Sequence, residues 1–214
     1  MALLENFSRM TTPVVKRLII INVIVWVFTK FTGNLMYEYM SLFYVGSPLF
    51  HPYQIITHLF MHGDFFHIFF NMYTLWLFGC ILENMWGSRK FLLYYFVTGL
   101  GAAGLHELVM YIQSTGMDSQ ALVLLNSTPT VGASGAIFGL LIAYGMLFPN
   151  NVLTLIFPPV SLKAKYFVLI FAGIELFFGV AGIGGNVAHF AHLGGALFGW
   201  LLMLYWKKTN RMYH

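Results

Sequence analysis

The residue with the clearest potential for chemistry is Ser134, which lies among glycines and alanines where an apolar segment begins. Pro129 precedes it, which suits a chain that turns into a helix close to the serine. The first N–H groups of a helix have no intrahelical partner and favour negative charge. A serine there could act as a nucleophile beside an oxyanion site. The alternative is a small capping or packing residue between crowded membrane helices.

A second polar series contains His58, His62, His67 and Asn71. His67 and Asn71 are four residues apart and therefore share a helix face, where an imidazole and an amide could both donate to one oxyanion. Histidines also bind zinc, but zinc needs three or four ligands. The nearest match to a zinc-protease helix motif, the His-Glu-Leu-Val-Met sequence that begins at His106, lacks the second histidine. We therefore expect no metal and no other cofactor.

Two glycine pairs of the G-x-x-x-G type accompany these polar residues. Gly135 and Gly139 follow the serine, and a second pair, Gly195 and Gly199, lies near the C-terminus. Such pairs allow two membrane helices to approach with their backbones in contact. We expect the helices that carry the two pairs to pack against each other.

A histidine lies on the same helix face as the second glycine pair. His192 is three residues before the first glycine of that pair, so helix packing through the glycines would bring it to Ser134. A serine with a histidine in hydrogen-bond reach is the minimum nucleophile and base pair. His189 has the same spacing from His192 and fits a structural role. For any one histidine, an interhelical hydrogen bond is the simpler explanation.

The composition indicates a membrane protein. The chain has 214 residues, of which 59% are hydrophobic and 8% are charged, and its mean hydropathy is +0.76. Soluble domains carry about 25% charged residues. The single cysteine, Cys80, excludes an intrachain disulfide and a cysteine-based metal site. We expect one compact domain and no cleavable signal peptide, because residues 1–12 are polar.

The apolar segments predict an all-α membrane protein with six transmembrane helices. We expect residues 1–16 to be a short lead, residues 17–206 to form the six-helix domain, and residues 207–214 to be a basic tail. The aromatic segment Thr32–Thr57 fits short pieces in the membrane interface. Residues 113–130 fit a polar loop. The expected spans are about 17–31, 62 or 65 to 82, 91–112, 131–148, 166–182 and 188–206.

The basic residues predict how this bundle is oriented. Six spans place both termini on one side, and all but one of the 11 Lys and Arg residues then fall on that side. Only Lys30 falls opposite. This positive-inside pattern makes both termini cytoplasmic, and it explains the net charge of +4 without a nucleic-acid partner.

Helix direction then places the polar residues at one level. The second, fourth and sixth spans all run inward, and His67, Asn71, Ser134 and His192 lie near the starts of these spans. At about 1.5 Å per residue they reach a similar depth in the outer part of the bilayer. Polar groups there are costly unless they pair or line a wet cavity. Three parallel helices with polar residues at one level make a candidate site.

Three motifs in order resemble the rhomboid intramembrane serine proteases, over nearly the whole chain. The serine motif alone would not be specific, but the three together are. The motifs are Gly132-Ala133-Ser134-Gly135, Ala191-His192-Leu193-Gly194-Gly195 with Gly199, and the series His62, His67 and Asn71.

The resemblance implies roles for the site residues. Ser134 would be the nucleophile and His192 the general base, in a dyad without an acid. Asn71, His67 and the Ser134 backbone N–H would form the oxyanion hole. The substrates would be transmembrane segments of other proteins, cut near their outer ends. Because helical amides are already hydrogen-bonded, such a segment must unwind before it is cut.

Some features depart from the family pattern or stay open. Phe138 stands where some rhomboids have tyrosine, and Tyr53-Gln54 stands where some have Trp-Arg. The resemblance also implies a mobile cap at 181–187 and substrate access beside the fifth span. Glu175, mid-way along that span, is a functional candidate as an intramembrane carboxylate. We favour a structural role for it, since it is expected to lie deeper than the site.

Two other functions remain open from the sequence. A small transporter or proton relay could use the histidines and Glu175, but no internal repeat is visible. A non-catalytic binder could use the same fold to recognise transmembrane helices. The lipid bilayer is a partner in every case. With no transit peptide visible, we expect a bacterial inner membrane.

Overall fold

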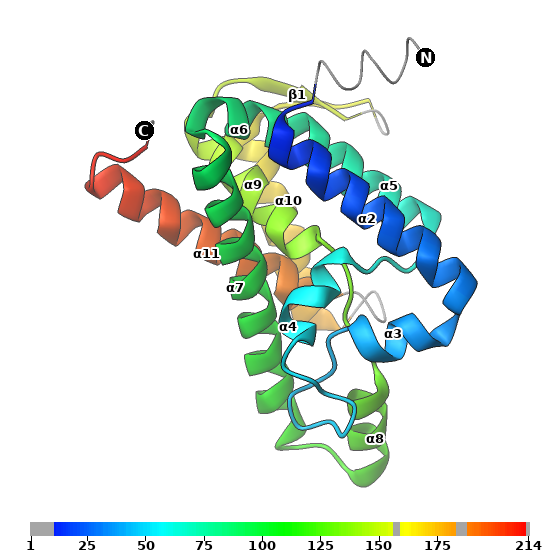
Figure 1. Cartoon of the computed structure of the whole chain (residues 1–214). Helices are drawn as coiled ribbons and strands as arrows, with labels where there is room; N and C mark the ends of the chain where they lie inside the picture. The colour runs from blue at the N-terminus through cyan, green and yellow to red at the C-terminus, as the bar shows by residue number, and fades with distance from the viewer. Residues whose placement is uncertain (1–10, 156–158, 183–187, 213–214) are drawn as a thin grey trace.

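The computed structural model describes residues 11–155, 159–182 and 188–212, and these are mostly helical (Figure 1). The elements in chain order are α2 (Pro13–Thr32), α3 (Asn34–Met40), α4 (Gln54–Thr57), the 3-10 turn η1 (His58–Phe60), α5 (Phe65–Thr74), the π-helical turn η2 (Leu75–Gly79), α6 (Cys80–Trp86), α7 (Ser88–Ser114), α8 (Ser119–Ser127), α9 (Ser134–Leu147), β1 (Val152–Thr154), β2 (Ser161–Lys163), α10 (Ala164–Ala181) and α11 (His189–Lys208).

Three helical segments of the described chain are long and apolar enough to cross a membrane. They are Phe65–Trp86, which joins α5, η2 and α6, then α7 with 27 residues and α10 with 18 residues. The apolar helix α9 is shorter, at 14 residues. The helices α2 and α11 were also expected as spans and have 20 residues each, but they are not among the three.

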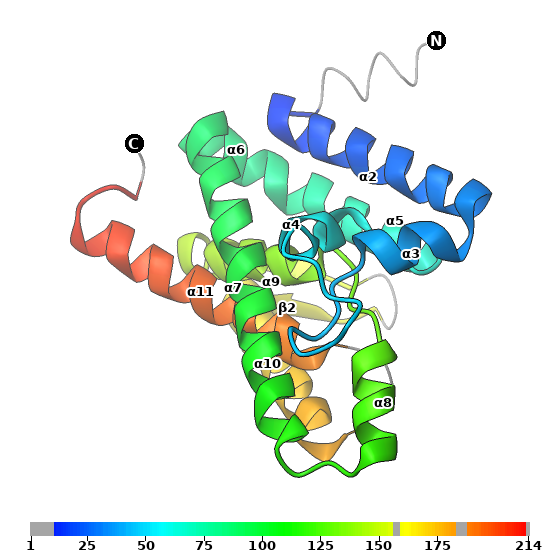
Figure 2. The same cartoon turned by 60° about the horizontal axis from the view of Figure 1, so that its bottom comes forward.

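The helices α7, α9 and α11 cross one another (Figures 1 and 2), and part of the hydrophobic core lies between them. Tyr94 and Tyr95 of α7, Leu140 of α9 and Met203 of α11 are completely buried there. The Tyr94 hydroxyl donates to the Gly139 carbonyl oxygen at 2.9 Å. Each of the three helices contacts the other two, and this packing fixes their relative positions.

The two glycine pairs meet between α9 and α11. A Cβ atom added to Gly195 would lie 1.8 Å from the Gly135 carbonyl oxygen, and one added to Gly199 would lie 3.0 Å from Gly139 Cα. No side chain fits between these backbones. The glycines thus bring the N-terminal half of α11 directly against the start of α9.

The start of α2, the turn between α6 and α7 and the end of α11 share one end of the molecule (Figure 1). The Glu83 carboxylate of α6 accepts the backbone N–H groups of Val14 and Val15, each at 2.9 Å. These N–H groups at the start of α2 have no intrahelical acceptor, so Glu83 caps that helix. At the same end, Lys90 Nζ donates to the Arg211 carbonyl oxygen. The helices α3, α4 and α8 lie at the opposite end.

Three local features differ from the sequence-based expectation. The expected lead 1–16 is shorter, because α2 already begins at Pro13, a residue favoured in the first helical turn. The expected polar loop 113–130 contains α8, which begins where Asp118 accepts the Ala121 N–H at 2.9 Å. An antiparallel β1–β2 hairpin joins α9 to α10.

Candidate active site

The segment that leads into Ser134 is held by the loop between α2 and α5. Leu42 and Thr130 exchange two backbone hydrogen bonds of 3.0 and 2.8 Å, and the Gly132 N–H donates to the His58 carbonyl oxygen at 2.9 Å. Gly132 has a φ of +121°, and a Cβ atom there would lie 2.8 Å from His67 Nε2. Glycine is needed at this position for both reasons. The loop therefore sets the approach of the chain to the serine.

Gln54 anchors this loop from inside. It is completely buried, its Nε2 donates to the Leu49 carbonyl oxygen at 3.0 Å, and its Oε1 accepts the His51 N–H at 3.0 Å. The His58 ring nitrogen Nδ1 contacts the Gln54 carbonyl oxygen at 2.8 Å. Burial lowers the pKa of His58 to about 4, so the ring is neutral and donates this bond. Gln54, one of the two residues that depart from the Trp-Arg pattern, thus anchors this loop through its own hydrogen bonds.

His106 and Glu107, the residues of the incomplete zinc motif, also hold this region. His106 Nε2 lies 2.8 Å from the Thr130 hydroxyl, and Glu107 accepts the Val45 N–H at 2.8 Å. The two side chains bind different segments and do not converge on one point. His106 supports the segment before the serine, and Glu107 supports the loop between α2 and α5.

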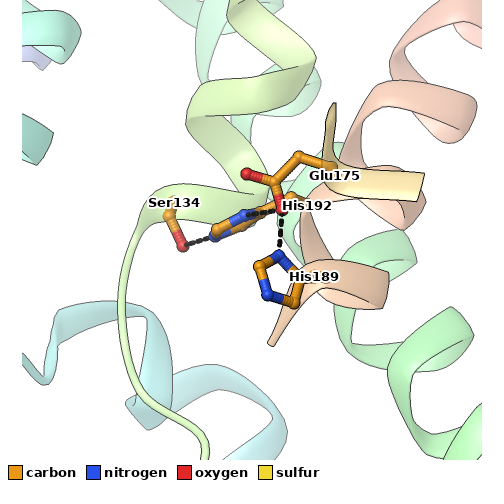
Figure 3. A network of polar contacts seen from close by, with 4 residues as sticks. All are labelled: Ser134, Glu175, His189 and His192. Atoms are coloured by element: carbon orange, nitrogen blue, oxygen red, sulfur yellow. Dashed lines mark hydrogen bonds and ion pairs between the residues drawn. The ribbon is translucent and has the colours of Figure 1, made fainter. Parts of the chain in front are cut away.

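Ser134 and His192 are in direct contact. The helix α9 begins at Ser134, and its Oγ lies 2.8 Å from His192 Nε2 (Figure 3). The His192 ring also stacks on Phe138, with ring centroids 4.5 Å apart and planes 5° from parallel. Phe138 has no hydroxyl to offer, so it orients the imidazole by its flat face alone. The glycine contact between α9 and α11 lies next to this pair.

The expected oxyanion donors lie on two elements. The Ser134 N–H is in the first turn of α9, where helical N–H groups lack intrahelical acceptors. The His67 ring approaches from α5 beside Gly132. Asn71 is buried on the same helix, but its Nδ2 donates to the His67 carbonyl oxygen at 2.9 Å. The amide is therefore engaged within its own helix in this structure.

Glu175 lies at the site, contrary to the sequence-based expectation that it is separated from the site along its helix. Its Oε2 is 2.6 Å from His189 Nδ1 and 3.0 Å from His192 Nδ1 (Figure 3). A depth that is calculated from the number of residues along a helix assumes that the helix is perpendicular to the membrane. It does not account for helix tilt or for a shift of one helix along its neighbour. A sequence signal was present, because an intramembrane carboxylate needs a partner and two histidines follow one turn apart.

The same cluster has the composition of a small metal site. One ligand atom from each of Glu175, His189 and His192 lies within 4.8 Å of the other two. In this arrangement, however, the carboxylate oxygen contacts both imidazoles directly, and one imidazole also contacts Ser134.

A cavity of about 330 Å³ opens beside the cluster. It lies between the ends of α7, α8, α10 and α11, and its polar lining includes His106, Thr130 and His189. The site therefore has room next to it on the side of α10. Of the expected cap at 181–187, only residues 181 and 182 lie in the described part of the chain, and Gly182 lines this cavity.

Comparison with known proteins identifies the family of this chain. A model of the rhomboid domain matches residues 49–208. The mitochondrial rhomboid protein 1 of Saccharomyces cerevisiae is 32% identical over 170 residues, which cover 78% of this chain and 44% of that protein. The human mitochondrial presenilin-associated rhomboid-like protein is 32% identical over 166 residues, which cover 71% of this chain and 38% of that protein.

A bacterial relative matches from end to end. The rhomboid protein YdcA of Bacillus subtilis is 29% identical over 220 residues, which cover 98% of each chain. The chain thus spans less than half the length of the mitochondrial relatives and nearly all of the bacterial one. The domain match and the apolar helices show that this integral membrane protein belongs to the rhomboid family, the family of intramembrane serine proteases.

Proposed function

We propose that this chain is a serine endopeptidase that cuts the transmembrane segments of other membrane proteins near their outer ends. Membership of the rhomboid family supports a protease that acts in the bilayer. The observation that carries the finer proposal is the 2.8 Å contact between Ser134 Oγ and His192 Nε2 at the start of α9. It joins a hydroxyl, a base and free helix N–H groups in one place.

The reaction is acyl transfer. The proton of the Ser134 hydroxyl passes to His192 Nε2 while Oγ attacks the carbonyl carbon of the scissile peptide bond. The resulting imidazolium gives its proton to the leaving amine, and the acyl group stays on Ser134. A water molecule then attacks the acyl-enzyme, with His192 again as base. In this proposal the water approaches from the cavity beside α10, which His189 and Thr130 line.

The oxyanion is held by donors from both sides of the serine. The Ser134 N–H belongs to the first turn of α9, and the His67 ring lies close to the backbone at Gly132. Asn71 can contribute its amide after this group leaves the His67 carbonyl oxygen, which it contacts at 2.9 Å. Each such donor supplies about 3–4 kcal/mol of transition-state stabilisation in serine proteases.

In the proposed topology six helical segments cross the membrane, and both termini are cytoplasmic. The crossing segments are α2, α5 to α6, α7, α9, α10 and α11. The shared end formed by the start of α2, the α6–α7 turn and the end of α11 carries basic residues, which supports a cytoplasmic position for it. The end-to-end match to a bacterial relative supports a bacterial membrane.

Substrates reach the site beside α10 in this proposal. Of the three apolar helices, α10 is by far the least covered by the rest of the protein, with 11% of its span buried against 44% and 39% for the other two. A loosely packed helix can move aside at low cost. The substrate must also unwind locally, so segments with glycine or other small residues near their outer ends are preferred.

Cleavage of a purified substrate tests the proposal. Wild type, Ser134→Ala and His192→Ala are compared in detergent on a transmembrane substrate with a destabilised outer end. We expect cleavage by wild type only, and labelling by a fluorophosphonate probe in wild type but not in Ser134→Ala. Equal cleavage by all three proteins would refute the proposal. Labelling that persists in Ser134→Ala would refute the assignment of the nucleophile.

A further inference from the structure

The catalytic histidine is in contact with a carboxylate on the side away from the serine. His192 Nε2 faces Ser134 at 2.8 Å, and His192 Nδ1 faces Glu175 Oε2 at 3.0 Å. The order serine, imidazole, carboxylate is visible in Figure 3. The three residues come from three helices, α9, α11 and α10, so their alignment is a property of the tertiary structure.

The Glu175 carboxylate is the acceptor within reach of His192 Nδ1. That nitrogen is buried and has no other hydrogen-bond partner among the described residues. The side chains of His192 and Glu175 are each 14% exposed, so little solvent competes for the contact. A buried N–H without an acceptor destabilises the folded protein. A carboxylate at 3.0 Å removes this destabilisation when Nδ1 carries the proton.

A neutral imidazole carries its proton on one nitrogen only, and the position decides whether it can act as a base. With the proton on Nδ1, Nε2 has a free lone pair that can accept the proton of Ser134. With the proton on Nε2, the ring would donate to the serine and could not deprotonate it. The carboxylate accepts hydrogen bonds only, so it favours the first form.

His189 gives Glu175 a second donor. Its Nδ1 lies 2.6 Å from the same Oε2 atom, and its ring packs edge-on against Phe178 at 5.8 Å. A carboxylate inside a membrane protein keeps its charge only when it is paired or hydrogen-bonded. Two imidazole N–H donors on one oxygen meet this need. His189 thus keeps Glu175 available for His192.

We propose that Glu175 is a positioning residue that converts the serine and histidine pair into a Ser134–His192–Glu175 triad, with His189 as the support of the carboxylate. The proposal rests on the proposed protease function. In the first step the Ser134 proton moves to His192 Nε2 and the Nδ1 proton stays in place. The imidazolium then lies beside an ionised Glu175, and it later gives the Nε2 proton to the leaving amine. Glu175 is not protonated at any step.

The test compares Glu175→Gln with wild type, Ser134→Ala and His189→Gln. Gln has the size of Glu but can turn its NH2 group toward His192 Nδ1, which favours the unreactive tautomer. We expect kcat to fall by at least about 10²-fold, and by up to about 10⁴-fold as when the acid of a triad is replaced. KM should stay within about twofold of the wild-type value. His189→Gln, which leaves the His192 contact intact, should lose less activity.

The pH profile of kcat/KM separates positioning from a structural role. Among the described residues, the other titratable side chains that act on His192 or Glu175 are His189 of α11, His67 of α5 and His106 of α7. All three remain in Glu175→Gln. Loss of the carboxylate removes a charge that stabilises the imidazolium, so the acidic limb of the profile should move to lower pH. A loss of activity with an unmoved profile and a lower melting temperature would overturn the proposal.

Nitrogen NMR of the wild type decides the matter even if Glu175→Gln does not fold. In protein labelled with ¹⁵N-histidine, the His192 signals are identified by their loss in His192→Gln. A neutral His192 with its proton on Nδ1 is the expected result, and a proton on Nε2 would overturn the proposal. Wild-type activity that is lost on dialysis against EDTA and restored by Zn²⁺ would also overturn it, in favour of a metal site.

The controls distinguish this proposal from the proposed function. If Ser134→Ala is inactive and Glu175→Gln has the kcat and the pH profile of wild type, the protease assignment stands and the triad is refuted. If Ser134→Ala cleaves as well as wild type, the protease assignment itself fails.

Discussion

Replacing Gly195 by alanine should separate the two helices that carry the nucleophile and the base. The added Cβ atom would lie 1.8 Å from the Gly135 carbonyl oxygen, whereas ordinary contacts begin at 3.4 Å. The backbones must therefore move apart by about 1.6 Å at this point. No side chain can rotate away to relieve the clash, because the opposing atom belongs to the backbone.

The displacement is transmitted directly to the site. Ser134 is adjacent to Gly135 in α9, and His192 is one turn before Gly195 in α11, so their contact of 2.8 Å should open beyond the hydrogen-bonding range. Misplacement of a catalytic group by about 1 Å costs about 10²-fold in rate. Forced overpacking also costs about 1–3 kcal/mol of stability. We expect kcat to fall by about 10²-fold or more, and the melting temperature to fall moderately.

Two other glycines give a graded comparison. Gly199→Ala should have a smaller effect. Its Cβ atom would lie 2.6 Å from the Tyr94 hydroxyl, the end of a side chain, and 3.0 Å from the backbone at Gly139 Cα, which is a milder clash than the 1.8 Å at Gly195. Gly173→Ala in α10 is the matched control, since nothing lies within 4 Å of its added Cβ atom. The assay is cleavage of the transmembrane substrate, with fluorophosphonate labelling as a readout of the serine activated by its base. Wild-type kcat and labelling in Gly195→Ala would show that the glycine contact does not hold the site together.

Three further predictions concern the scaffold. Gln54→Leu leaves the Leu49 carbonyl and the His51 N–H without these partners. We expect the free energy of unfolding, measured with denaturant, to fall by about 1–3 kcal/mol. An unchanged free energy of unfolding would contradict the anchoring role of Gln54. Glu83→Gln weakens the cap on α2, and thermal unfolding should show a loss of about 1–2 kcal/mol. Acid should destabilise the wild type, because the pKa of His58 is about 4 in the folded protein and 6.5 ordinarily. Between these pH values only the unfolded chain gains a proton at this histidine. The free energy of unfolding should therefore fall as the pH drops from 6.5 to 4, by on the order of 3 kcal/mol in total. His58→Gln should have a flatter stability profile over this range.

The membrane class and the main helices followed from local sequence patterns. Apolar segments, charge deficiency and turn residues indicate membrane helices, because each of these signals acts over a few neighbouring residues. The start of α9 at Ser134 was expected from Pro129 and the small residues around the serine. The helix α8 and the β1–β2 hairpin were not expected, since both are short and rely on contacts that lie outside the apolar pattern.

The sequence by itself also determined which side chains compete for a catalytic role, and that glycine pairs could bring two of their helices together. It could not place Glu175, because depth along a helix says nothing about tilt or about which neighbour a side chain faces. The contacts of His192 with Ser134 on one side and Glu175 on the other depend on how α9, α10 and α11 pack. Such packing is the sum of many contacts between residues far apart in the chain, and only the tertiary structure contains it.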